Sequence, residues 1–191
     1  AGVLLGIATI LNEKNSSKNF DFYSGVSAGA VNSAFLASSK ESFLSSTQAL
    51  CKLWSELSAG DIYKTDFIAM GKIGWGWIRD TSFGGIIKGR NANFLLNSDP
   101  LKDLIKAHID FEQIHKNISE KKVKALALTA FNYSENRSIC FYNSNPKVSP
   151  WERSRRSSQY CKITSTHVAA SAAIPVVFKP VSLEGHYYGD G

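Results

Sequence analysis

The sequence predicts an α/β fold in which helices pack on a largely parallel sheet. Short apolar segments with strand character alternate along the chain with segments of helical periodicity. One tight strand–turn–helix unit stands out near residues 20–38. Of the 191 residues, 43% are hydrophobic, which is enough for one sizeable core, so we expect a single domain over residues 1–191.

Helical segments are predicted from apolar spacing and from their start signals. Residues 28–38 are rich in small side chains and suit a helix packed closely on a sheet. Asp99-Pro100 is a typical opening for a helix, because proline is tolerated in the first turn. The other helices are expected at residues 1–13, 41–58 and 166–173.

Strands are predicted where apolar, β-branched or aromatic residues form short runs. They are expected at residues 20–24, 124–130, 138–142, 176–178, 181–183 and 186–188. The polar, proline-containing stretch 143–160 is interpreted as an exposed loop, and residues 59–98, with their many glycines, as a loop or short irregular helices.

The chain carries a formal net charge of +6. A basic balance favours nucleic acid, an anionic membrane surface or acidic substrates, although it also serves solubility alone. The densest cluster, Arg153, Arg155 and Arg156, lacks the zinc spacing, heptads or aromatic RNA signature of a nucleic-acid reader, so no nucleic-acid partner is expected.

Cysteine use and hydropathy exclude further classes. The three cysteines, Cys51, Cys140 and Cys161, form no CxxC pair, so neither a disulfide framework nor a metal site is expected. No run of about 18 uninterrupted apolar residues occurs, so no transmembrane helix is expected. Cytoplasmic and secreted locations both stay open.

Gly25-Val26-Ser27-Ala28-Gly29 matches the pattern G-x-S-x-G. In a nucleophile elbow of this kind, a strand turns sharply into a helix and the serine lies on the strained turn, near the helix N-terminus where negative charge is favoured. A strand is expected just before the motif and a helix just after it. The alternative is a Gly-Ser turn that only joins the two elements.

A serine hydroxyl needs a base that accepts its proton. Of the four histidines, His167 and His186 are the better placed by chain order, while His108 and His115 fall on or beside a helix. The other candidate is Asp190, which lies between two glycines after an expected strand. Asp-Gly is also a common turn pair, so the residues alone leave these bases open.

Several segments together resemble the patatin-like phospholipase family. Gly25 to Ala30 resembles its nucleophile elbow, and Asp190-Gly191 resembles the start of its Asp-Gly motif. Between them, the segment from Ala169 to Val181 (AASAAIPVVFKPV) is similar to the family's Ala-Ser-x-Ala-Ile-Pro-x-x-Phe-x-Pro segment. These motifs occur in the family's order, and the similarity spans most of the chain.

The resemblance implies a three-layer α/β/α fold with a mainly parallel central sheet. It implies a catalytic dyad in which Ser27 attacks an acyl ester and Asp190 serves as base, with no metal and no organic cofactor. Substrates would be phospholipids or lysophospholipids, met at a membrane surface. A Ser-His-Asp esterase using His167 or His186, and a non-catalytic lipid-binding domain, are the rival interpretations.

The resemblance also implies that a Gly-rich loop before the first helix forms the oxyanion hole. The chain begins at Ala1-Gly2-Val3, where the helix after that loop would begin, so the oxyanion donors are expected upstream of Ala1. The domain is therefore expected to be truncated at both ends. Trp75 and Trp77 are candidate lipid contacts in a flap over the acyl site, since tryptophan favours membrane interfaces; a loop packed onto the domain is the alternative.

Overall fold

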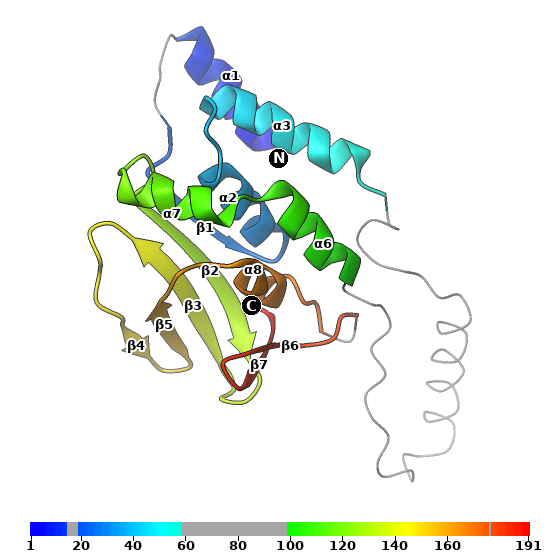
Figure 1. The fold of residues 1–191 in the computed structure, drawn as a ribbon, viewed down its shortest axis with the longest axis vertical. Coiled ribbons are helices and arrows are strands. Elements are labelled where there is room, and N and C mark those ends of the chain that lie inside the picture. Colours follow the sequence, from blue (N-terminus) through cyan, green and yellow to red (C-terminus); the bar gives the residue numbers. More distant parts are fainter. Residues whose placement is uncertain (15–18, 59–98, 176) are drawn as a thin grey trace.

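A computed structural model describes residues 1–14, 19–58, 99–175 and 177–191, with only the backbone described at positions 99 and 100. The chain forms a seven-stranded mixed sheet with helices packed against it (Figure 1). The helices are α1 (Gly2–Glu13), α2 (Ala28–Ala37), α3 (Phe43–Glu56), α6 (Asp99–His108), α7 (Phe111–Ser119) and α8 (Ser165–Ser171). The strands are β1 (Phe22–Val26), β2 (Ala125–Asn132), β3 (Arg137–Ser144), β4 (Glu152–Arg153), β5 (Arg156–Tyr160), β6 (Val181–Leu183) and β7 (His186–Asp190).

The sheet is mostly antiparallel, so the expectation of a mainly parallel sheet was wrong. Only β1–β2 and β3–β5 pair in parallel; β2–β3, β2–β7, β4–β5 and β6–β7 are antiparallel. The reason lies in two hairpins. Glu184 and Gly185 both have positive φ, at 51° and 83°, which is the backbone of a two-residue turn between antiparallel strands. The four residues 133–136 join β2 to β3 in a second hairpin, in which Asn136 has a positive φ of 53°.

Strand β2 organises the sheet, because three strands pair with it. β3 occupies one edge over the full length of β2, from Ala125 to Asn132. β1 and β7 must therefore share the other edge. β1 runs parallel to β2 and ends with Val26 opposite Thr129, whereas β7 runs antiparallel and ends with Asp190 opposite Ala130. The two strands thus point toward each other, and their C-terminal ends meet.

Helices α2, α7 and α8 touch the sheet, and α2 contacts both α7 and α8, so the three lie on the same face. Buried β2 side chains such as Leu126 and Leu128 point to this face. On the opposite face Phe22 and Val26 of β1 are exposed. The third layer that the three-layer expectation requires is therefore not found among the described residues, which form a helical layer on one face of the sheet.

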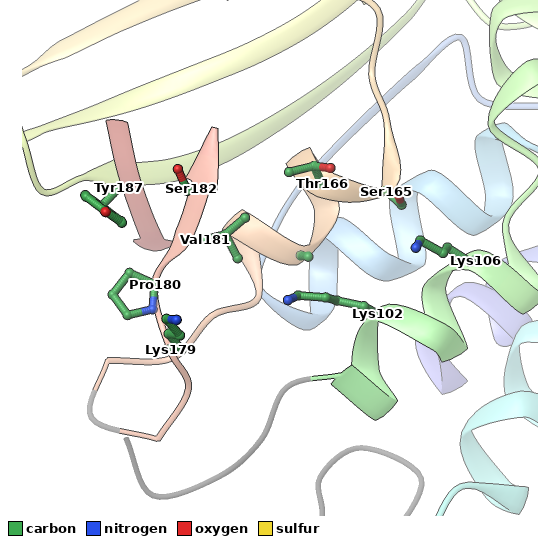
Figure 2. A pocket seen from close by; sticks show the side chains of 10 residues that line it. Lys102, Lys106, Ser165, Thr166, Lys179, Pro180, Val181, Ser182 and Tyr187 are labelled. Atoms are coloured by element: carbon green, nitrogen blue, oxygen red, sulfur yellow. The ribbon is translucent and has the colours of Figure 1, made fainter. Parts of the chain in front are cut away.

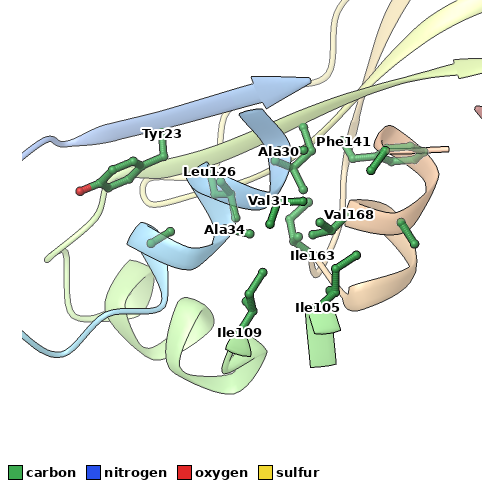
Figure 3. Packing of buried hydrophobic residues seen from close by; sticks show 14 of the residues in the cluster. Tyr23, Ala30, Val31, Ala34, Ile105, Ile109, Leu126, Phe141, Ile163 and Val168 are labelled. Atoms are coloured by element: carbon green, nitrogen blue, oxygen red, sulfur yellow. The ribbon is translucent and has the colours of Figure 1, made fainter. Parts of the chain in front are cut away.

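The core lies between the sheet and this helical layer. Ala30, Ala34 and Ala37 of α2 are fully buried, which confirms that small side chains let this helix approach the sheet closely. Figure 3 shows α2 between Leu126 of the sheet and Ile105 at the end of α6. The helix expected at residues 1–13 is present. Ala8 is buried, and Leu4 and Leu11 on the same face pack against the core while partly buried, whereas most apolar side chains on the other faces are exposed.

Most predicted elements are present within one or two residues. Helix α7 was not predicted, and two other segments differ from their predictions. The stretch 143–160 was predicted as a loop, but it contains β4 and β5; β5 pairs with β3 along its open edge although its sequence, RSSQY, has little apolar character. The strand predicted at 176–178 is reduced to an isolated bridge at Phe178, with residue 176 outside the described part.

One buried amide ties the helical layer together. Asn117 of α7 is 2% exposed, and its Nδ2 donates to Ala37 O at 2.8 Å and to Ser39 O at 2.9 Å. Its Oδ1 accepts a hydrogen bond from Nε2 of Gln113 at 2.8 Å. The end of α2 is therefore fixed to α7 through two hydrogen bonds that water cannot replace easily, and the third, within α7, holds the amide in place.

We predict that Asn117→Leu lowers the free energy of unfolding by about 2–3 kcal/mol, because it leaves two carbonyls and an amide buried without partners. Urea unfolding measures the loss. The matched control is Lys116→Ala on the exposed side of the same helix, which should change stability by less than about 0.5 kcal/mol. Equal effects of the two substitutions would contradict this role of Asn117.

Candidate active site

Ser27 lies on the turn between β1 and α2, as the motif predicted. Its backbone has φ 57° and ψ −127°, a conformation that non-glycine residues adopt rarely and at a cost. The carbonyl of Ser27 accepts hydrogen bonds from the amides of Ala30 and Val31, at 2.9 and 3.4 Å, which begins α2 immediately after the turn. The strand–turn–helix unit of a nucleophile elbow is therefore present.

The two glycines of the motif, Gly25 and Gly29, differ in the space around their α-carbons. A Cβ on Gly25 would collide with the backbone carbonyl of Gly29, because the strand and the first turn of α2 approach each other closely. A Cβ on Gly29 would meet no described atom within 4 Å. A close backbone approach therefore requires glycine at position 25 but not at position 29.

The hydroxyl of Ser27 donates a hydrogen bond to Oδ2 of Asp190 at 2.7 Å, although the two residues are 163 positions apart. The pairing of β1 and β7 along the same edge of β2 explains the contact, since Ser27 follows the end of β1 and Asp190 ends β7. The amide of Asp190 donates to Ala173 O at 2.8 Å, which fixes the end of β7 to the segment after α8.

Ser171, the last residue of α8, holds the turn in place. Its Oγ donates to Thr129 O at 2.6 Å and accepts from the amide of Ser27 at 3.1 Å; the same amide also lies 3.2 Å from Ser171 O. The side chain is fully buried. The sequence placed Ser171 in a family-like segment but gave no sign of this contact, which depends on α8 and β2 meeting in space.

Tyr133 lies close to the end of β7. A Cβ on Gly189 would collide with the Tyr133 side chain, so the glycine leaves room for the ring, which packs against Phe131 with centroids 5.5 Å apart. Partial burial, and then the negative charge of Asp190, raise the pKa of Tyr133. The phenol therefore stays protonated beside the carboxylate.

None of the four histidines, all of which are described, hydrogen-bonds to Ser27. His167 is buried, and its Nδ1 accepts from the amide of Thr164 at 3.1 Å, so in the neutral ring the proton lies on Nε2, which faces Sγ of Cys161 at 3.5 Å. Burial raises the pKa of Cys161 to about 12 and lowers the pKa of His167. This Cys–His pair is therefore neutral and lacks the thiolate that a cysteine nucleophile needs.

His115 and His186 also contact residues other than Ser27. His115 has its Nε2 3.0 Å from Ile163 O, and burial, followed by the charge of Lys162, lowers its pKa. His186 stacks edge-on with Tyr188, and its Nδ1 is buried without a hydrogen-bond partner among the described residues. The geometry thus brings together Ser27 and Asp190 and leaves His167 and His186 out.

The first amides of α2 are open toward Ser27. Neither the N–H of Ala28 nor that of Gly29 donates to a described residue, as is usual for the first turn of a helix. These donors and the positive end of the helix dipole favour negative charge near the serine.

The remaining expectations concern lipid-contacting tryptophans, membrane-spanning helices and metal ligands. Trp75 and Trp77 lie outside the described residues. Over the ranges that the structure describes, no helix combines the length and apolar character needed to cross a bilayer, and no three His, Cys, Asp or Glu side chains are grouped to hold a metal ion.

The fold is that of an α/β protein, with a serine–aspartate pair at the turn between β1 and α2. The chain belongs to the patatin-like phospholipase family, because the sequence model of this family matches residues 1–191. It is also similar to a solved structure, VipD from Legionella pneumophila, with 16% sequence identity and a TM-score of 0.42. That match covers 98% of this chain and 43% of VipD. No curated protein matches the chain.

We predict that Gly25→Ala lowers the free energy of unfolding by about 2 kcal/mol or more, because its Cβ overlaps backbone atoms that cannot move aside easily. Gly29→Ala is the matched control from the same motif. It should change stability by no more than about 1 kcal/mol, and in the stabilising direction, because alanine favours helix and nothing obstructs its Cβ. Thermal unfolding of the two variants distinguishes them, and the reverse order would contradict the packing described.

Proposed function

We propose that the protein hydrolyses acyl ester bonds of phospholipids or lysophospholipids, with Ser27 as nucleophile and Asp190 as base. The observation that carries the proposal is the 2.7 Å hydrogen bond from Ser27 Oγ to Asp190. Membership of the patatin-like phospholipase family supports a lipid ester as the substrate. The strained backbone of Ser27 adds support, because such strain is found at functional turns.

The proposed reaction has two steps. Ser27 Oγ attacks the ester carbonyl while its proton passes to Asp190, and collapse of the tetrahedral intermediate gives an acyl-serine and releases the alcohol, which takes the proton from Asp190. A water molecule then gives a proton to Asp190 and attacks the acyl-serine. The fatty acid leaves, and the proton returns to Ser27 Oγ. Proton transfer by a positioned base contributes roughly 10²–10⁴ in rate.

The tetrahedral intermediate carries a negative charge on the former carbonyl oxygen. We assign the amide of Ala28 as one of its donors, because it follows the nucleophile directly and has no other partner among the described residues. A donor placed where charge develops contributes about 10²–10³ in rate.

The geometry around Ser27 gives less support to the two rival functions. A Ser-His-Asp esterase needs a histidine beside Ser27, but Asp190 occupies that position and His167 bonds to Thr164 instead. A non-catalytic lipid-binding domain would not need a serine hydroxyl joined to a carboxylate at a strained turn. Contact of the protein with the membrane surface is part of the same proposal, because its substrates reside there.

The test is hydrolysis of phosphatidylcholine and lysophosphatidylcholine in mixed micelles, measured as the amount of fatty acid released. Asp190→Asn should lower kcat/KM by roughly 10²–10⁴, since the amide cannot accept the serine proton. Ser27→Ala should abolish the activity. His186→Ala is the control and should retain most of the activity.

The opposite pattern would reject the dyad. If Asp190→Asn kept the activity while His186→Ala or His167→Gln lost it, a histidine base would have to replace Asp190. If the purified protein hydrolysed neither lipid while folded, and Ser27→Ala bound lipid equally well, the non-catalytic function would be favoured.

A further inference from the structure

A second polar site lies on the other side of α8 from the elbow contacts. A pocket of about 460 Å³ opens between α6, the beginning of α8 and the β6–β7 hairpin (Figure 2). Its lining includes neither Ser27 nor Asp190. The lining residues are Lys102, Lys106, Ser165, Thr166, Ala169, Lys179, Pro180, Val181, Ser182 and Tyr187.

The lining is rich in hydrogen-bond donors and carries positive charge. It contains three lysines and four hydroxyl groups, and no aspartate or glutamate. Neither Lys106 nor Lys179 forms an ion pair within the described part of the chain. A volume of this size matches the range in which proteins hold small molecules, but the lining is more polar than is usual for apolar ligands.

The lysines are held in positions that favour a shared anion. Lys102 and Lys106 are four residues apart on α6 and so lie on one face of the helix, which Figure 2 shows directed over α8. Lys179 lies in the segment before β6, across the pocket from α6 (Figure 2).

The walls of the pocket are fixed by packing. Leu101 and Ile105 of α6 are buried in the core, so the helix that carries two of the lysines is held against α8. Ala169 of α8 and Val181 of β6 are buried beneath the pocket and form its apolar floor. The backbone that carries Lys102 and Lys106 is therefore fixed beside the pocket, while the side chains of Lys106 and Lys179 are exposed to solvent at its rim.

We propose that this pocket binds the phosphomonoester group of an anionic organic phosphate. A phosphomonoester carries a charge of about −1.5 to −2 near neutral pH and offers three strong acceptor oxygens, which suits several ammonium and hydroxyl donors. A carboxylate has a single charge and only two oxygens, so it would leave more of these donors without partners. The volume leaves room for an organic group attached to the phosphate.

The site is independent of the proposed catalysis, since it shares no residue with the serine–aspartate pair. Ser165 and Ser171 are six positions apart on α8, about 9 Å along its axis, while Ala169, which also lines the pocket, precedes Ser171 by two positions. A soluble metabolite and a lipid headgroup both carry such a phosphate, and the experiment separates these two sources.

The test measures binding by the full chain carrying Ser27→Ala, so that no lipid is consumed. The soluble probe is sn-glycerol 3-phosphate, and its binding is measured by isothermal titration calorimetry. Glycerol and acetate are the controls that should not bind. The membrane probe is a phosphatidylcholine vesicle containing phosphatidic acid, compared with one of equal surface charge containing phosphatidylserine. We expect saturable binding of glycerol 3-phosphate, preference for phosphatidic acid, or both.

The variant Lys106→Gln with Lys179→Gln should weaken this binding by roughly tenfold or more, because two charge-assisted contacts to the phosphate are lost. The control, Lys40→Gln with Lys147→Gln, removes the same charge from exposed positions outside the pocket and should leave binding within about twofold.

Each outcome of the binding experiments either supports or overturns the proposed phosphate site. Binding of glycerol 3-phosphate that the pocket variant loses identifies a soluble organic phosphate as sufficient, and loss confined to phosphatidic acid vesicles identifies the lipid headgroup. The proposal is overturned if neither probe binds selectively, or if the pocket variant and the control weaken binding equally, since net charge would then account for it. Hydrolysis by the wild-type chain does not enter either result.

Discussion

The structure depends on the division of one edge of β2 between two strands that run in opposite directions. β3 occupies the whole opposite edge, so β1 and β7 must share what remains. Their C-terminal ends meet between Thr129 and Ala130, and this junction alone brings a serine near the N-terminus into contact with an aspartate at the other end of the chain. The proposed nucleophile and its proposed base are thereby positioned by backbone pairing, which is more rigid than a contact between two loops.

Several interactions hold this junction against backbone strain. The positive φ of Ser27 costs of order 1–3 kcal/mol, which neighbouring contacts must offset. Ser171 contributes by bonding to both the Ser27 amide and Thr129 O, so that α8, β2 and the elbow are fixed together. Gly25 contributes by having no side chain where α2 returns toward β1. The strain and its support lie within a few residues of the proposed nucleophile.

The sequence predicted the local parts of this arrangement better than the pairing between them. Apolar and small-residue patterns located α2, β2 and α8, because these elements bury one face. The hairpins were missed because Glu184-Gly185 is not a typical turn pair, and β5 was missed because pairing, not an apolar pattern, makes it a strand. Ser27 and Asp190 were identified through motifs in order, whereas Ser171's contacts and the lysine pocket arise from distant segments that no spacing reveals.

The most direct measurement of the central claim is the rate at which a fluorophosphonate labels the folded protein, with the site identified by mass spectrometry. If Asp190 accepts the serine proton, Ser27 is labelled in the wild type, and Asp190→Asn slows labelling by about 10²-fold or more while His167→Gln and His186→Ala do not. Labelling at an unchanged rate in Asp190→Asn, or at a serine other than Ser27, would contradict the account.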